Sequence, residues 1–287
     1  MKKITFHCQT ITPMFLSGAD GTTPELRPPS IKGAMRFWWR AMNGHLPLAE
    51  LKKEEVKIFG GSYKDENGKE VSMRSKIQLR IDNHAKAEKN LKTSFQKVLV
   101  HKKETFTKNA FEPKQSFNIV FTANDEQSEL LVKCLFPLVC ILGGFGNRAR
   151  RGMGSLKILD DNFPKSIEGI YELINQIVPK KFILKTSIIE TYTTLRYDLP
   201  AIKRIEIGEP NIDVLYKINN ATHEVKQKFG FNYDEALGSA KPRFASPVFI
   251  STFVTNRGVC PIVTTLNIKD GTKRKFDIQN ELIKKIV

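Results

Sequence analysis

The sequence has few of the residues that build metal sites and disulfide frameworks. Its 287 residues include four cysteines and five histidines. The cysteines are scattered and include no Cys-x-x-Cys pair, which argues against a zinc site and a disulfide framework. We therefore expect reduced, buried thiols in a cytoplasmic protein, and no metal or other cofactor. The cysteines are Cys8, Cys134, Cys140 and Cys260.

Long apolar runs are also missing. The longest, Leu130–Leu142, is too short to span a bilayer and contains Lys133. The chain starts Met-Lys-Lys-Ile-Thr-Phe-His-Cys, and polar residues follow where a signal peptide would have its apolar segment. Both observations favour a cytoplasmic protein with no membrane partner.

Acidic residues are scarce relative to basic ones. There are 30 Asp and Glu against 46 Lys and Arg, so the formal net charge is +16. A surplus of this size favours an acidic partner, above all a nucleic acid. The alternative is a surface charged only for solubility, but balanced Lys and Glu would not leave such a surplus. Hydrophobic residues make up 40% of the chain, enough for a folded core.

The stretch Gly143–Gly154 reads Gly-Gly-Phe-Gly-Asn-Arg-Ala-Arg-Arg-Gly-Met-Gly, and we name it the glycine–arginine loop. Glycines let a backbone approach a ligand closely, and arginines form planar contacts with phosphates. The loop follows a predicted helix and precedes a predicted strand. A dinucleotide site needs the opposite order, and a Gly-Lys-Ser/Thr P-loop is absent. The loop therefore favours RNA, with a flexible basic connector as the alternative.

The clearest predicted helix is Ile31–Met42. Ser30 after Pro28–Pro29 supplies an N-cap, and Asn43–Gly44 supplies a C-terminal signal. At about 100° per residue, the apolar side chains of this helix fall on one side. That side is expected to pack on a sheet.

The opposite side of this helix carries a basic stripe, formed by Lys32, Arg36 and Arg40 at intervals of four residues. Trp39 borders the stripe, and no acidic residue occurs between Ile31 and Met42. An ordinary solvated face is the alternative. The cations and the neighbouring tryptophan favour contact with a ligand.

The first half of the chain has the predicted order strand, helix, two strands, helix, strand. This order is that of a ferredoxin-like domain, in which two helices cover one face of an antiparallel sheet. We therefore predict an α+β protein with a ferredoxin-like (RRM-like) domain at residues 1–160. The expected strands are residues 3–16, Ser75–Ile81, Phe117–Ala123 and Leu156–Leu159, and the second helix is Gln127–Leu142, with a kink at Pro137.

The second half, residues 161–287, is predicted to be a second, degenerate domain of the same type. Helical patterns occur at Ile167–Val178 and Ile212–Phe229, and Asn219–Asn220 could break the second of these. Strand-like patterns occur at Lys181–Tyr192 and in a hairpin, Pro247–Ile268.

Catalytic residues are hard to find in the sequence. The five histidines form no metal-spaced pair, and the paired carboxylates are typical of solvated loops. His45, just after the basic helix, is the best candidate for an acid–base role in RNA cleavage. We expect no enzymatic activity, with a metal-independent endoribonuclease as the alternative.

Several of these segments together resemble the RAMP superfamily of CRISPR proteins. They include the stretch Thr12–Ala19, the run Glu25–Ala41 with Arg-Pro-Pro-Ser-Ile-Lys-Gly and Arg-Phe-Trp-Trp-Arg, Ile58–Gly60, and the glycine–arginine loop. The run Glu25–Ala41 is similar to the first RAMP subunit of Cmr (type III-B) effector complexes. In the second half only Arg243–Pro247 adds to the resemblance.

The resemblance implies tandem ferredoxin-like domains in a non-catalytic subunit at the end of an antiviral complex. Such a subunit holds the 3′ region of single-stranded guide and target RNA beside other RAMP subunits. Cleavage of the target belongs to a neighbouring subunit in this family, and some relatives are endoribonucleases that process guide RNA.

Carried onto this sequence, the resemblance places RNA contacts on the basic stripe and on the glycine–arginine loop. Phosphate contacts should dominate, and Trp39 could stack on a splayed base. Replacing the loop arginines by alanine is expected to abolish RNA binding and to leave the fold unchanged. The predicted RNA-binding residues are Lys32, Arg36, Arg40, Arg148, Arg150 and Arg151, with Arg27, Trp39, Arg196 and Arg243 as further positions.

Overall fold

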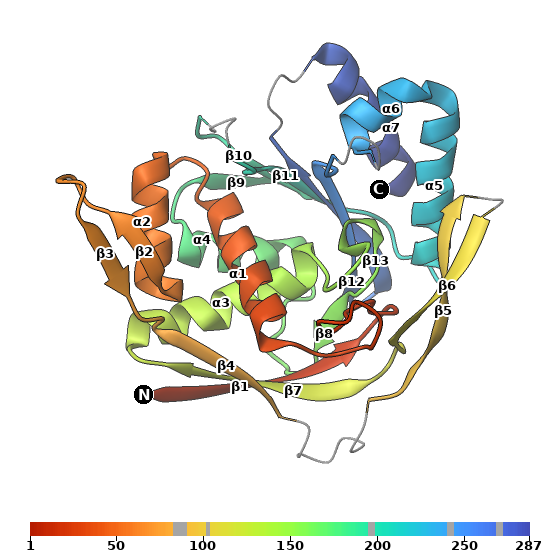
Figure 1. Cartoon of the computed structure of the whole chain (residues 1–287). Coiled ribbons are helices and arrows are strands. Elements are labelled where there is room, and N and C mark those ends of the chain that lie inside the picture. Colours follow the sequence, from red (N-terminus) through yellow and green to blue (C-terminus); the bar gives the residue numbers. More distant parts are fainter. Residues whose placement is uncertain (83–90, 102–103, 195–198, 240–243, 268–271) are drawn as a thin grey trace.

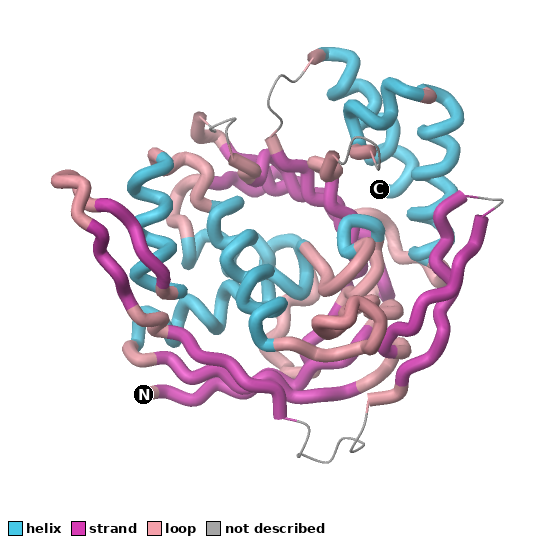
Figure 2. The backbone as a smooth tube through the Cα atoms, viewed as in Figure 1, coloured by secondary structure: helices cyan, strands magenta, loops and turns pink. Residues whose placement is uncertain are grey.

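Helices fill the space between two antiparallel sheets, and a second group of helices covers the outer face of the second sheet (Figures 1 and 2). The structure is a computed structural model, and it describes residues 1–82, 91–101, 104–194, 199–239, 244–267 and 272–287. In this described part, no helix is both long and apolar enough to cross a membrane.

The first sheet has the strand order β4-β7-β1-β8. Alternate residues of β1 (Ile4, Phe6 and Cys8) are buried on the helix side, where α1 and α3 cover the sheet. This arrangement confirms the predicted ferredoxin-like order. Its elements are β1 (Lys2–Thr10), α1 (Pro28–Met42), β4 (Ile77–Asp82), β7 (Ser116–Ala123), α3 (Glu126–Leu142) and β8 (Leu156–Ile158).

Two insertions extend this first half. The first consists of α2 (Leu48–Phe59) and a hairpin of β2 (Gly61–Lys64) and β3 (Glu70–Met73), and α2 packs beside α1. The second is a long hairpin of β5 (Thr93–His101) and β6 (Glu104–Phe111), which lies beside a helix of the second half (Figure 1). The strand and helix periods of the sequence predicted neither insertion.

The second sheet has the order β12-β13-β11-β10-β9 and confirms the predicted α+β class with antiparallel sheets. The edge strands of this sheet are β12 and β9, and β10 lies between β11 and β9. Helix α5 continues through the Asn219–Asn220 pair. The elements are α4 (Ile167–Ile177), β9 (Phe182–Lys185), β10 (Ile188–Thr191), β11 (Ile202–Ile207), α5 (Val214–Phe229), α6 (Phe231–Leu237), β12 (Val248–Thr255), β13 (Gly258–Leu266) and α7 (Lys273–Ile286).

One apolar core joins the two halves. The second half of α3, residues 134–142, is buried all round because the helix packs on the first sheet and also on β12 and β13. The Trp38 ring contacts Phe37 and, at 5.0 Å between ring centroids, Phe249 of β12. Because the core is shared, the two halves stabilise each other, and the boundary between residues 160 and 161 stays a prediction.

Candidate RNA interface

The glycine–arginine loop is packed tightly against the chain. Gly146 has φ +87°, and a Cβ there would lie 2.3 Å from the carbonyl oxygen of Phe15. At Gly154, with φ +69°, a Cβ would lie 2.0 Å from the carbonyl oxygen of Phe145. The Asn147 amide donates to the Phe15 carbonyl at 2.9 Å. These glycines therefore serve close packing within the chain, which corrects the expectation that they mainly admit a ligand.

Two arginines of this loop dock it onto the second half. They lie in a short 3₁₀ helix, Ala149–Arg151. The Arg151 guanidinium donates to the carbonyl oxygens of Leu237, at 3.0 Å, and Val248, at 3.2 Å. Arg150 donates to the carbonyl of Ser246. Alanine at these positions would remove the docking contacts, so the expectation that the triple change leaves the fold intact does not fit this geometry.

The loop arginines nevertheless keep a surplus of positive charge. Among the described residues, Arg150 and Arg151 bond to carbonyl and hydroxyl oxygens and form no ion pair with a carboxylate. Burial and the nearby Arg151 charge lower the pKa of Arg148 and of Arg150. An anion at this surface would relieve both the repulsion and the loss of hydration.

The basic stripe of α1 contacts α2. The Arg36 and Arg40 guanidinium groups share the buried Glu55 carboxylate, at 2.6 and 2.5 Å. Lys32 donates to the hydroxyl of Ser75 at 2.7 Å, and burial together with the Arg36 charge lowers the Lys32 pKa. Two guanidinium groups on one carboxylate leave a net positive stripe. The sequence predicted that the pair Glu54–Glu55 is solvated. That prediction is wrong for Glu55, which α2 buries against α1.

The side chains of Arg36 and Arg40 remain about one-third exposed, 34% and 36%. Both could therefore contact a phosphate without leaving Glu55. Arg27, the residue before α1, is 37% exposed and lies 3.9 Å from the Glu25 carboxylate. Arg196 and Arg243 lie outside the described residues.

Trp39 does not have the placement that was expected. Its side chain is buried, and its ring packs edge-on against Phe59 of α2. A base could not stack on its face without displacing this contact. The sequence placed Trp39 at the border of the stripe, but α2 covers it. Phe244, two residues before Ser246, is instead an aromatic side chain that is 49% exposed.

Aromatic contacts connect the basic stripe with the glycine–arginine loop. Phe37 of α1 lies 5.4 Å from Phe249 of β12, between ring centroids. The Arg150 guanidinium lies over the Phe249 ring at 4.4 Å. The buried Phe249 and the half-buried Phe37 therefore link the two predicted walls. We name the exposed side chains of the basic stripe and of the glycine–arginine loop around this contact the α1–loop face. The sequence analysis missed Phe37 and Phe249, which belong to elements far apart in the chain.

The open face of the first sheet offers little for base stacking. In an RRM, aromatic side chains on the open sheet face stack on bases. Here the strand aromatics Phe6, Phe117 and Phe121 are buried on the helix side. The open face carries polar pairs instead, such as His7 with Asn118 at 2.7 Å.

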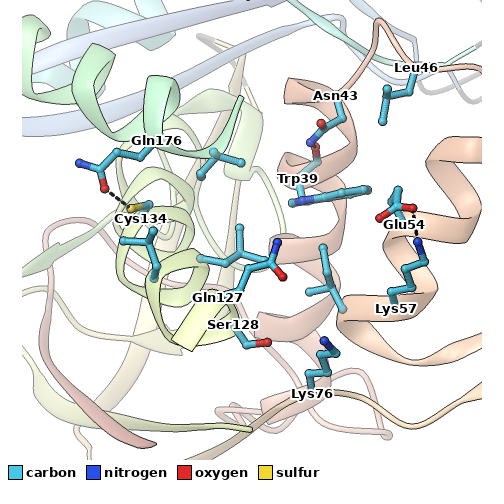
Figure 3. A pocket seen from close by; sticks show the side chains of 14 residues that line it. Trp39, Asn43, Leu46, Glu54, Lys57, Lys76, Gln127, Ser128, Cys134 and Gln176 are labelled. Carbon is cyan, nitrogen blue, oxygen red and sulfur yellow. Dashed lines mark hydrogen bonds and ion pairs between the residues drawn. The ribbon is translucent and has the colours of Figure 1, made fainter. Parts of the chain in front are cut away.

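A cavity of about 410 Å³ lies between α1, α2, α3 and α4 (Figure 3). It is lined by both charge signs, and Glu54 and Lys57 pair with each other at its rim. Burial raises the pKa of Cys134 to about 11, so the thiol in this cavity stays protonated at neutral pH. The cavity matches neither a polyanion nor a cysteine nucleophile.

His45 lies in the connection between α1 and α2, at the C-terminal end of α1. Burial and the Lys181 charge lower the pKa of His45. No cluster of three or more metal-ligating side chains occurs among the described residues. His45 lies just beyond the end of α1 that carries Arg40 of the basic stripe.

Comparison with known proteins identifies the family. Residues 7–157, slightly more than half of the chain, match the model of the RAMP superfamily. The chain belongs to the RAMP superfamily. The matched region contains α1, the glycine–arginine loop and the first sheet of this RAMP protein.

Two curated relatives come from Pyrococcus furiosus. CRISPR system Cmr subunit Cmr1-2 is 31% identical over 182 residues, covering 55% of this chain and 96% of the relative. CRISPR system Cmr subunit Cmr1-1 is 28% identical over 245 residues, covering 77% of this chain and 71% of the relative. The resemblance inferred from the sequence motifs is thus confirmed.

Solved structures show the same fold over the whole chain. The crystal structure of Cmr1 from P. furiosus in its apo form matches with a TM-score of 0.64 at 20% identity, covering 100% of this chain and 97% of that one. A cryo-EM structure of the type III-B Cmr-beta bound to cognate target RNA contains a chain that matches with a TM-score of 0.58 at 11% identity, covering 99% of both chains. At these identities the likeness concerns the fold.

Proposed function

We propose that this RAMP protein is the Cmr1-type subunit of a type III-B CRISPR complex, and that it holds single-stranded RNA on the α1–loop face without cutting it. The observation that carries the proposal is that Arg36 and Arg40 of α1 and Arg150 of the loop are held by contacts around one aromatic pair, Phe37 and the buried Phe249. Because the curated relatives are Cmr1 subunits of a CRISPR Cmr system, we propose the other RAMP subunits of such a complex as partners.

The charges on this face suit a ligand that is recognised by its phosphates. Their positions are fixed by contacts within the protein, so little side-chain order has to be gained on binding. A guide RNA varies in sequence, and phosphate contacts hold it without reading its bases. We assign the 3′ region of the guide and target RNA to this face by analogy with the family.

A holding role also fits the chemistry of the described residues. His45, the candidate acid–base residue, belongs to no metal-ligating cluster among the described residues, and the cavity thiol of Cys134 stays protonated. We infer that the chain contributes binding and that cleavage belongs to other subunits.

The test is binding of a fluorescein-labelled, unstructured single-stranded RNA to the full chain at several salt concentrations. If about four cations contact phosphates, the logarithm of the association constant should fall with the logarithm of salt concentration with a slope of about −3. Arg148→Gln should weaken binding and flatten this slope. Arg257→Gln is the matched control, because Arg257 is 66% exposed in the β12–β13 turn. Absence of salt-dependent binding, or equal losses in both variants, would refute the proposal.

A further inference from the structure

Gly33 is an exposed glycine in the interior of α1. Its backbone is helical, and a Cβ at this position would have no atom of the described residues within 4 Å. Glycine is a poorer helix former than alanine because it loses more backbone freedom on folding. The residue therefore weakens α1, and no contact within the described part of the chain requires it.

Other glycines that lie in open space or in a helix are explained by a positive φ angle or by a close neighbour. A Cβ would also find open space at Gly21, Gly68 and Gly230, but these three residues have positive φ angles, which favour glycine. Gly169 of α4 is helical, and a Cβ there would lie 3.1 Å from the Cβ of Pro164. Gly33 has neither a positive φ nor a close neighbour.

The side chains that could cover Gly33 point away from it. In a helix, residues three and four positions later lie on the same face and lean back over the earlier turn. Here Arg36 forms an ion pair with Glu55, and Phe37 packs against Phe249 on the other side. Bare helix backbone is left between a guanidinium group and an aromatic ring on the α1–loop face.

The N-terminus of α1 is a poor anion-binding site. Pro28 and Pro29 have no amide hydrogen, and the Ser30 and Ile31 amides donate to the Arg27 carbonyl. The usual cradle of free amides at a helix N-terminus is therefore absent here. An anion on this helix has to lie against its side, where Lys32, Arg36 and Gly33 are.

We propose that the sugar–phosphate backbone of single-stranded RNA crosses α1 at Gly33, in van der Waals contact with the helix backbone. The missing side chain brings the phosphates within reach of Arg36 on one side and Arg150 on the other. The surplus of positive charge on both sides favours a polyanion over a protein segment as the occupant. This inference rests on the proposed function and adds the path of the RNA.

The test compares Gly33→Leu and Gly33→Ala with Asn280→Leu in the full chain. Asn280 is exposed on α7, on the far side of the second sheet, so its variant adds the same side chain away from the face. Binding of labelled oligouridine and the melting temperature are measured for each variant. Gly33→Leu should weaken binding about tenfold or more, and Asn280→Leu should leave it unchanged.

Gly33→Ala distinguishes a lost RNA contact from a loss of folding stability. It should raise the melting temperature by about 2 °C and still weaken RNA binding. Wild-type affinity in Gly33→Leu would overturn the inference and leave the proposed function standing. Wild-type affinity together with lost assembly with partner subunits would also overturn it, and would assign the bare backbone to a protein. A wild-type chain that binds no RNA would instead refute the proposed function.

Discussion

The guanidinium group of Arg150 lies over the ring of Phe249, 4.4 Å from its centroid. This contact joins the glycine–arginine loop of the first half to β12 of the second half. Phe249 also contacts Phe37 of α1, so a single aromatic ring fixes the loop relative to the basic stripe. The loop is therefore preorganised by packing, and its cations keep their positions without a ligand.

Arg151→Ala should lower the free energy of unfolding by about 2–3 kcal/mol, because buried carbonyl groups lose a charged donor. Urea unfolding followed by circular dichroism measures this change. Arg257→Ala, an exposed control in the β12–β13 turn, should change it by less than about 0.5 kcal/mol. Equal stability of the Arg151 variant and the wild type would mean that the loop does not depend on this docking contact.

Glu55→Gln separates the structural role of the basic stripe from its binding role. The loss of a buried carboxylate between Arg36 and Arg40 should reduce stability by about 1–3 kcal/mol. It also removes a negative charge from the α1–loop face, so RNA binding should stay the same or become tighter. The double variant Arg36→Ala/Arg40→Ala should lower both the free energy of unfolding and the affinity for RNA. Weaker RNA binding in Glu55→Gln would indicate that the stripe acts only through its packing.

Phe244→Ala should weaken binding of single-stranded RNA by about 1–3 kcal/mol if the exposed ring stacks on a base, as base–aromatic contacts elsewhere do. Phe244 is 49% exposed and lies near the Ser246 carbonyl that accepts from Arg150. Tyr216→Ala is the matched control, since Tyr216 is 57% exposed on α5. The same loss of affinity in both variants would argue against a stacking role for Phe244.

Incubation with CRISPR repeat RNA in EDTA should yield no discrete product. The described residues offer His45 as an acid–base candidate, but no metal-ligating cluster accompanies it among them. Gel electrophoresis of end-labelled RNA checks this expectation, with His45→Ala as the comparison. A discrete cut that disappears in the variant would favour the guide-processing endoribonuclease instead.

The local patterns of the sequence predicted most of the first half. The alternation of apolar and polar residues identified β1 and β7, and the helical period placed the basic stripe of α1 correctly. Both signals depend only on neighbours in the chain. The sequence did not predict α2, whose Glu55 binds Arg36 and Arg40. Without α2, Trp39 was expected to be exposed, and the basic stripe was expected to have no partner within the protein.

The role of the glycine–arginine loop also depended on distant contacts. Its residues indicated a polyanion, but the acceptors of Arg151 are Leu237 and Val248, more than eighty positions later in the chain. Backbone carbonyls carry no residue signature, so no sequence pattern could have pointed to them. The same holds for Phe249, which links the loop to α1.

Photo-crosslinking locates single-stranded RNA on the protein and so checks whether it lies on the α1–loop face. The full chain is bound to RNA that carries 4-thiouridine, irradiated, digested and mapped by mass spectrometry. We expect crosslinks in the peptides that contain α1 and the glycine–arginine loop, and their loss in Gly33→Leu. Crosslinks confined to the open face of the first sheet or to α5 and α7 would contradict this expectation.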